Sequence, residues 1–400
     1  INMNWIEQLK EIHPLFKIYS LKMPKKIIFG LNSLEKITEE AKNMGGKKAL
    51  LITDKNLEKT NLVKNVIQYL EKAGYNIEVF SEVEPEPKLE KSEGIKNIVE
   101  GKNFDLIVGF GGGSVLDTAK IASILATNPG KIEDYLGFDL VKKPGLPKIL
   151  IPTTAGTGSE VTRVSVFTKG NTKVSVYSDY LFADVAIVDP LVTISLPPHL
   201  TASTGFDALS HAIEAYMSLS GNILTDTISL KVIEIISKYL RKAYFNGDDI
   251  EARYYMSIAA TMAGICIANA MACLGHAIGL VLGAKYHLSH GVSCALALPY
   301  TIEYNSIVLN EKIFNIAKAL GEETNGSLEE ISMKVVNSIK KLMKDVGLPI
   351  SLKEIKGASI EDIPELAQET IKIKRLLILN PRKVSYEDTI KIFNKMFEVN

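Results

Sequence analysis

Residues 204–216 read Thr-Gly-Phe-Asp-Ala-Leu-Ser-His-Ala-Ile-Glu-Ala-Tyr, and the rest of the chain is organised around this run. The run predicts a helix, in which residues four apart lie one above the other on one face. Asp207 and His211 therefore point the same way, and a carboxylate and an imidazole at that spacing suit a divalent transition metal. A hydrogen bond between the two side chains on a solvated helix is the alternative interpretation.

Two later histidines favour the metal interpretation. His276 and His290 stand in apolar, glycine-rich sequence that reads as buried. A buried neutral histidine needs partners for both ring nitrogens, and a metal on one with a hydrogen bond on the other supplies them. Either residue could instead be a core histidine bonded to a backbone carbonyl. Taken together, one aspartate and three histidines on helices that pack against one another predict a site with four ligands.

The first half of the chain alternates apolar strands with amphipathic helices. The predicted strands are residues 26–30, 48–53, 77–80, 106–110, 148–152 and 185–188, with a hairpin at 163–168 and 173–177 and a helix at 89–100. This pattern indicates a parallel sheet covered on both faces. After residue 196 the patterns are almost entirely helical. We therefore expect an α/β nucleotide-binding domain at 1–196, whose first 20 residues include a short amphipathic helix, and an all-helical domain at 197–400.

Length and charge limit the classes of function. A chain of 400 residues favours two domains. The 46 basic and 46 acidic side chains cancel to a net charge of zero, which provides no general attraction to nucleic acid or to an acidic membrane surface. Neither a cleavable leader nor an apolar run of about 18 residues is evident, so a cytoplasmic protein that acts on small molecules is expected.

A glycine-rich turn follows the predicted strand 106–110 and precedes a helix. Residues 109–120 read GFGGGSVLDTAK, in which the glycines allow a ligand to approach the backbone amides and the helix start can hold a pyrophosphate. The alternative is a tight turn that binds nothing. A second loop, PTTAGTGSE at 152–160, could line a phosphate or ribose. Asp54, after the strand 48–53, could accept a hydrogen bond from an adenosine ribose and repel a 2′-phosphate, which favours NAD over NADP. Asp54 could also cap the next helix.

These motifs together resemble the iron-containing, group III, alcohol dehydrogenase family. The similarity runs from about residue 24 to the C-terminus and includes GGGS at 111–114, PTTAGTGSE at 152–160, FDALSHAIE at 206–214 and NPR at 380–382. It implies a Rossmann-like nucleotide domain of mostly parallel sheet and a helical domain, as in dehydroquinate synthase, with the active site in the cleft between them.

The resemblance also implies site residues. The four metal ligands fall on Asp207, His211, His276 and His290, so His287 is not a ligand. Fe(II) is the expected metal, with Zn(II) as the alternative. The cofactor, NAD or alternatively NADP, would contact Asp54, Gly112, Gly113, Ser114, Asp117, Thr153, Thr154, Thr157 and Lys173. Members of the family are often dimers.

The implied activity is hydride transfer between a small alcohol or aldehyde and a nicotinamide cofactor. Leu280 departs from the family, because many members carry a histidine at this place, near the nicotinamide, as a candidate for proton relay. Besides a nucleotide-binding protein without catalysis, two other interpretations remain. One is a lyase resembling dehydroquinate synthase, which would need several Lys and Arg to hold a phosphorylated substrate. The other is an enzyme resembling maleylacetate reductase, without metal.

Overall fold

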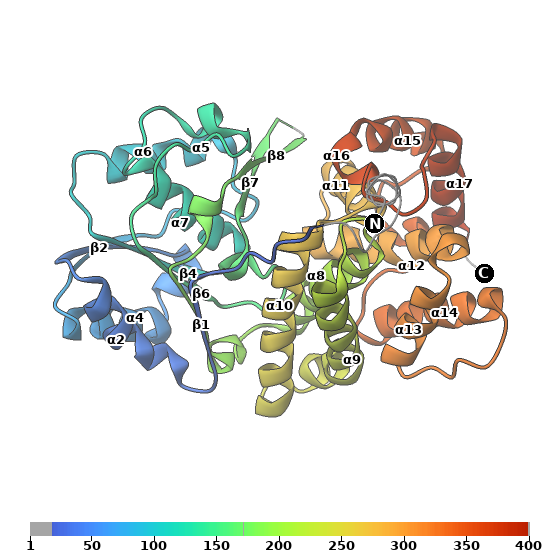
Figure 1. Cartoon of the computed structure of the whole chain (residues 1–400), viewed down its shortest axis with the longest axis horizontal. Coiled ribbons are helices and arrows are strands. Elements are labelled where there is room, and N and C mark those ends of the chain that lie inside the picture. Colours follow the sequence, from blue (N-terminus) through green and yellow to red (C-terminus); the bar gives the residue numbers. More distant parts are fainter. Residues whose placement is uncertain (1–17, 171, 399–400) are drawn as a thin grey trace, which may run out of the picture.

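The computed structural model describes residues 18–170 and 172–398, so most of the short helix expected near the N-terminus lies outside the described residues. Figure 1 shows an α/β half and a helical half that lie side by side. The change from one to the other comes between the strand β9 (Val185–Val188) and the helix α8 (Pro198–Met217). This arrangement confirms the predicted fold class.

The α/β half is built on a six-stranded sheet in the order β1-β9-β6-β4-β2-β3. All its strand pairs are parallel. The strands besides β9 are β1 (Lys26–Phe29), β2 (Lys48–Ile52), β3 (Asn76–Phe80), β4 (Leu106–Gly111) and β6 (Lys148–Pro152). The carboxyl ends of parallel strands share one edge of a sheet, so the loops after β2, β4 and β6 meet there.

Both faces of this sheet are buried at its centre, which explains why β4 is apolar throughout and why β2 and β6 are apolar after their first lysine. Leu51 and Val108 face the layer that contains α2 (Ile37–Met44) and α4 (Asn61–Lys72). Leu50 and Ile107 face the opposite layer, formed by α5 (Leu89–Ser92), α6 (Gly94–Val99) and α7 (Gly113–Leu125). Successive side chains of a strand point to opposite faces, so a strand covered on both sides needs apolar residues throughout. The short helix α3 (Lys55–Glu58) follows β2.

Two local features differ in detail from the predicted elements. The helix expected at 89–100 is interrupted, because α5 ends at Ser92 and α6 begins at Gly94. Glycine is a poor helix former, so a break at this place has a physical reason. The predicted hairpin is present as β7 (Val164–Lys169) and β8 (Thr172–Tyr177), which pair antiparallel. It belongs to a separate three-stranded sheet that β5 (Gly137–Phe138) completes by pairing with β8.

The helical half packs around α8, which is buried along almost its whole length. Its core joins α8 with α9, α10, α12 and α14. A second core joins α11 and α12 to α15 and α17. The helices after α8 are α9 (Ile223–Phe245), α10 (Ile250–Ala270), α11 (Leu274–Tyr286), α12 (His290–Leu309), α13 (Glu311–Ala319), α14 (Leu328–Asp345), α15 (Ile363–Lys372), α16 (Lys374–Leu377) and α17 (Tyr386–Phe397).

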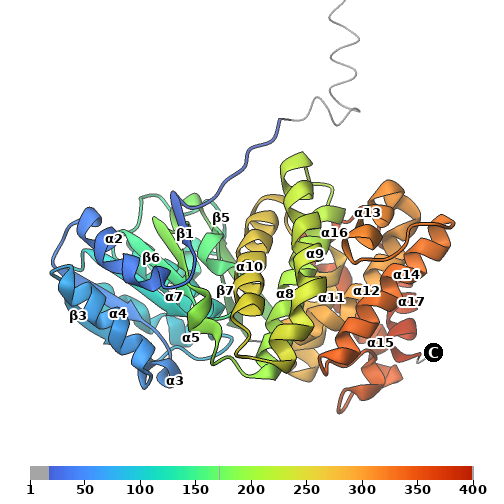
Figure 2. The same cartoon turned by 90° about the horizontal axis from the view of Figure 1, so that it is seen from below.

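Helix α10 forms much of the contact between the two halves, and Figure 2 shows it facing the α/β half. Its Gly264 lies against Gly158, where an added Cβ would come within 2.4 Å of the Gly264 Cα. Beside them, the fully buried Glu160 accepts a hydrogen bond of 2.8 Å from the Thr261 hydroxyl. Glycine is needed at this approach because any side chain would separate the two backbones.

Among residues 18–170 and 172–398, no single helix is both long and apolar enough to cross a membrane. Helices α10 and α11 reach that length and apolarity only as a pair, and the pair is bent by 106°.

Candidate metal centre and cofactor cleft

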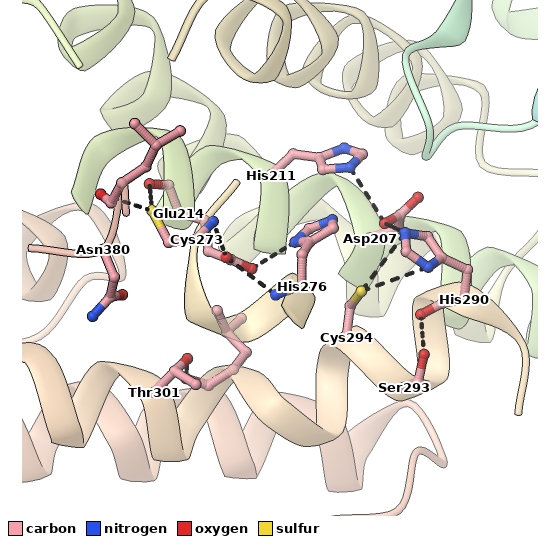
Figure 3. Close-up of polar contacts among 12 residues, drawn as sticks. Asp207, His211, Glu214, Cys273, His276, His290, Ser293, Cys294, Thr301 and Asn380 are labelled. Atoms are coloured by element: carbon pink, nitrogen blue, oxygen red, sulfur yellow. Dashed lines mark hydrogen bonds and ion pairs between the residues drawn. The ribbon is translucent and has the colours of Figure 1, made fainter. Parts of the chain in front are cut away.

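The four predicted ligands meet at one point of the helical half (Figure 3). Asp207 and His211 come from the middle of α8, His276 from the first turn of α11, and His290 is the first residue of α12. One donor atom from each of these side chains lies within 4.8 Å of those of the other three. The helical spacing of the first pair and the predicted packing of the later histidines therefore combine in a single cluster.

Glycines beside the two later histidines allow this approach. An added Cβ at Gly275 would lie 2.5 Å from the Glu214 Oε1 atom, and one at Gly291 would lie 2.0 Å from the Ser203 carbonyl oxygen. Both partners belong to α8. The starts of α11 and α12 can therefore lie directly on α8 only because neither position carries a side chain.

Several polar atoms of the cluster are buried without a hydrogen-bond partner. They are Asp207 Oδ1, His211 Nδ1 and His276 Nε2. Asp207 Oδ1 lies 3.5 Å from the Nε2 atom of His211 and 3.6 Å from the Nε2 atom of His290, beyond good hydrogen-bond distance. Buried polar atoms normally have partners. The unpartnered atoms and the donor set fit one divalent transition metal held between the four side chains.

The surroundings affect the protonation of the four clustered side chains. Burial lowers the pKa of His211 to about 4, which keeps its ring neutral and able to bind a cation. Burial alone would raise the pKa of Asp207, but the three neighbouring histidines outweigh it and lower that pKa. The pKa of His290 is raised to about 9, because Cys294 and then Asp207 favour its charged form more than burial opposes it. The cluster thus combines a carboxylate with imidazoles whose pKa values are shifted in opposite directions.

Glu214 holds His276 from the side opposite the cluster. Its Oε1 atom lies 2.6 Å from the His276 Nδ1 atom, and the side chain is fully buried. Its Oε2 atom accepts hydrogen bonds from the backbone amides of Cys273, at 2.7 Å, and His276, at 3.2 Å. A carboxylate on one ring nitrogen fixes the tautomer that leaves the other nitrogen free for a metal.

Sequence reasoning did not single out Glu214, although a signal for it was present. Asp207, His211 and Glu214 lie at positions i, i+4 and i+7 of one helix, so they share a face. Cys294 is a second neighbour of the cluster that the motifs did not indicate. It is buried, and its Sγ atom lies 3.7 Å from the His290 Nε2 atom, so it packs directly against the cluster.

A cavity of about 320 Å³ leads from the four ligands to the glycine-rich turn of the α/β half. Five of the residues predicted to contact the cofactor line it: Gly113, Ser114, Asp117, Thr157 and Lys173. Four others do not line this cavity: Asp54, Gly112, Thr153 and Thr154. Of these, Asp54 caps α3, where its Oδ1 atom accepts hydrogen bonds from the amides of Asn56 and Leu57. Leu280 lines the cavity as well, one helical turn after His276.

Asp117 is already occupied by partners within the protein. Its carboxylate accepts hydrogen bonds from Lys120 Nζ at 3.1 Å, Ser159 Oγ at 2.6 Å and the amide of Val166 at 2.9 Å. Lys120 is fully buried, and burial lowers its pKa. These contacts join α7 to the second loop and to β7, so Asp117 also helps to build the wall of the cavity.

The chain matches two family models that together cover nearly all of it. One, iron-containing alcohol dehydrogenase, matches residues 24–190. The other, the C-terminal part of the Fe-containing alcohol dehydrogenase family, matches residues 201–397. The two matches therefore include the glycine-rich turn and all four clustered ligands.

Individual relatives agree with these models. Long-chain-alcohol dehydrogenase 1 of Geobacillus thermodenitrificans (strain NG80-2) is 41% identical over 374 residues, which are 92% of this chain and 94% of the relative. A crystal structure of 1,3-propanediol oxidoreductase superposes with a TM-score of 0.91 at 36% identity, covering 95% of this chain and 100% of the other. The structure of sulfoacetaldehyde reductase from Bifidobacterium kashiwanohense in complex with NAD⁺ gives a TM-score of 0.86 at 28% identity. The match covers 96% of this chain and 100% of the other.

The matches extend over both halves of the chain and include the residues that line the cavity between them. Related chains of this length and fold are alcohol dehydrogenases and aldehyde reductases. This chain belongs to the iron-containing alcohol dehydrogenase family and is an oxidoreductase of that family.

Proposed function

We propose that Asp207, His211, His276 and His290 hold one divalent metal ion and that the adjoining cavity binds a nicotinamide cofactor and a small alcohol or aldehyde. The observation that carries this proposal is the convergence of four donor atoms within 4.8 Å, with three buried polar atoms left unpartnered. When bound, the metal supplies Lewis-acid polarisation of the substrate oxygen, and the nicotinamide supplies or accepts the hydride.

Fe(II) is the metal we propose, because the chain belongs to a family named for iron. Three imidazoles and one carboxylate also suit Zn(II), Ni(II) and Co(II), and the affinity order alone does not choose among them. Zn(II) is the alternative. Glu214 supports any of these ions equally, because its role is to orient His276 and fix its tautomer.

The cofactor we propose is NAD rather than NADP. Gly113 and Ser114 begin α7 and line the cavity, so the amides at this helix start can hold a pyrophosphate. Lys173 lines the same part of the cavity. Both cap bonds of Asp54 go to its Oδ1 atom, which leaves its Oδ2 atom without a cap bond, and a carboxylate after the end of β2 would disfavour a 2′-phosphate. The NAD⁺ complex of a relative is consistent with this choice.

The remaining cofactor contacts that the sequence predicts, Gly112, Thr153 and Thr154, belong to the loops after β4 and β6 at the same edge of the sheet. We propose that they complete the cofactor site beyond the cavity. The domain division at 196/197 is part of the same proposal, with the cofactor on the first domain and the metal on the second.

The cavity wall also determines how protons and water reach the reacting centre. The cavity wall is apolar at Leu280, Ile267 and Ala272, which pack together. Leu280 lies where a relay histidine would be placed by the family pattern, so this wall offers no proton carrier at that position. The chain therefore relies on another route for the proton, and we propose ordered water or a cofactor hydroxyl.

Metal analysis and a substrate panel test this proposal. Protein purified without exposure to air should contain about one metal ion per chain and should oxidise primary alcohols with net accumulation of NADH. Metal-free protein that turns over fully would favour an enzyme resembling maleylacetate reductase. Phosphate release without net NADH would favour a lyase. A homodimer in the cytoplasm is the expected setting, and light scattering of the purified protein tests the dimer.

A further inference from the structure

Arg375 lines the catalytic cavity and has no carboxylate partner. It lies on α16, and its Nη1 atom donates a hydrogen bond of 2.6 Å to the Tyr177 hydroxyl at the end of β8. Within residues 18–170 and 172–398, no aspartate or glutamate forms an ion pair with it. A guanidinium has five donors, so this arginine retains hydrogen-bonding capacity toward the cavity.

The other charged residues of the cavity wall are neutralised within the protein. Lys173 forms an ion pair of 2.9 Å with Glu86. Arg163 forms ion pairs with Asp139 and, at 3.0 Å, with Asp179. Asp117 is paired with Lys120, and Asp207 belongs to the metal cluster. Arg375 is therefore the one charged group lining the described cavity that lacks an opposite charge.

Arg375 also lies away from the place where the cofactor phosphates are expected. Every second residue of β8 lines the cavity, namely Lys173, Ser175 and Tyr177. At the Lys173 end, Glu86 joins the strand to the glycine-rich turn, because its amide donates to the Ser114 hydroxyl at 3.2 Å. Tyr177 is four residues further on, which corresponds to about 13 Å of strand. The contact with Arg375 is at this far end.

An apolar wall connects Arg375 to the metal ligands. Its neighbour Leu376 packs with Ala272 and Leu280, which lie four residues before and after His276. All three line the cavity. A substrate whose oxygen faces the ligand cluster would lay its carbon chain along this wall and end near Arg375.

We propose that Arg375 binds an anionic group, a carboxylate or a sulfonate, at the end of the substrate remote from the reacting carbon. This inference rests on the proposed function and narrows its substrate to aldehydes or alcohols with an acidic tail. Arginine suits the role because its planar fork can donate two parallel hydrogen bonds to such a group. The hydrogen bond from Arg375 to Tyr177, whose ring stacks on Phe138 with centroids 4.4 Å apart, holds the guanidinium in place.

The test compares two series of aldehydes with the metal-loaded enzyme and NADH. One series is unbranched and neutral, and the other carries an ω-carboxylate or an ω-sulfonate on chains of equal length. The wild-type enzyme should prefer the anionic series. Arg375→Met should lower the ratio of kcat/KM for anionic over neutral aldehydes by about 10- to 100-fold, mostly through KM, because a hydrogen bond to a charged group is lost. Arg375→Lys should restore part of the ratio, and comparison of the two anions shows which one is bound better.

Lys374→Met is the matched control, because Lys374 is exposed on the same helix and does not line the cavity. Its selectivity ratio should equal that of the wild type. The inference would be wrong if the wild type showed no preference for anionic aldehydes. It would also be wrong if Arg375→Met and Tyr177→Phe each lowered kcat/KM equally for both series. A rise in the KM for NADH in Arg375→Met, with the selectivity ratio unchanged, would likewise overturn it. No turnover of either series by wild-type enzyme would overturn the proposed function itself.

Discussion

The Nδ1 atom of His276 lies 2.6 Å from the Oε1 atom of Glu214, and the Nε2 atom of the same ring is buried without a partner. The two nitrogens thus have different tasks. Because Glu214 accepts a hydrogen bond from the Nδ1–H group, the lone pair on Nε2 is free for a cation. Glu214 comes from the same helix as Asp207 and His211, so α8 supplies two of the four proposed ligands and the carboxylate that orients a third.

Replacement of Glu214 by alanine should therefore weaken metal binding. The change removes the orienting carboxylate and leaves the amides of Cys273 and His276 without their acceptor. We expect metal affinity to fall by about 10- to 100-fold and stability to fall by about 1–3 kcal/mol for each buried donor left unpaired. Competition with a chelator measures the affinity, and denaturant unfolding measures the stability.

Glu251→Gln is a control for this substitution. Glu251 lies at the start of α10, outside the cluster, and accepts a hydrogen bond from Tyr239. Its metal affinity should match that of the wild type. If Glu214→Ala kept wild-type affinity, the orienting role would be wrong.

Replacement of His276 by alanine should abolish metal retention and turnover while NAD still binds. The residue is one of four donors, and the glycine-rich turn that is proposed to hold the cofactor lies in the other half of the chain. Metal content and equilibrium binding of NAD, followed separately, check both parts of the expectation.

His287→Asn is the control for His276. His287 is not a member of the cluster, and it ends α11 with a φ of 55°, a conformation that asparagine adopts more easily than most residues. This variant should keep its metal. Loss of metal from it, or full metal and rate in His276→Ala, would contradict the assignment of the ligands.

Lys148 should produce a pH-dependent term in stability. The residue is buried at the start of β6, 3.9 Å from Asp184, and burial lowers its pKa from 10.5 to about 8. Between these two values the unfolded chain binds the proton and the folded chain does not, so the contribution of Lys148 to the free energy of unfolding rises with pH. Lys148→Met removes this term. The free energy of unfolding of the variant minus that of the wild type should be lower at pH 10 than at pH 7 by about 2–3 kcal/mol.

Denaturant unfolding of both proteins at the two pH values checks this expectation. The comparison uses the difference between variant and wild type, so the titration of other groups cancels. A difference that stays constant across the range would show that the pKa of Lys148 is the same in the folded and unfolded chains.

Patterns within single elements were sufficient to predict much of this molecule. Apolar strands followed by amphipathic helices predicted the parallel sheet, and the spacing of Asp207 and His211 predicted a shared helix face. The relations that could not be predicted join separate elements. The contact between Arg375 and Tyr177 connects residues 198 positions apart in sequence, and nothing in either local sequence specifies how α16 lies against β8.

Two other contacts could not be predicted for the same reason, because they also join separate elements. Asp117 lines the cavity, and its carboxylate also accepts hydrogen bonds from a buried lysine and from a serine of a distant loop, which the sequence did not indicate. These partners depend on how the second loop packs on α7. The pairing of Glu214 with His276 likewise depends on how closely α11 approaches α8, although the spacing along α8 already placed Glu214 on the face of the ligands.

Gly291 follows His290 directly and controls how closely α12 approaches α8. An alanine there would place its Cβ 2.0 Å from the Ser203 carbonyl oxygen, so the start of α12 must move and carry His290 with it. We expect Gly291→Ala to lose about 1–3 kcal/mol of stability through this overpacking and to bind metal more weakly. Gly283→Ala, on α11, is the matched control, because its Cβ would meet nothing closer than 3.5 Å and alanine favours a helix by about 1 kcal/mol. Denaturant unfolding and chelator competition should therefore show lower stability and weaker metal binding for Gly291→Ala than for Gly283→Ala. Equal stability and equal metal affinity of the two variants would show that the contact between α12 and α8 does not position His290.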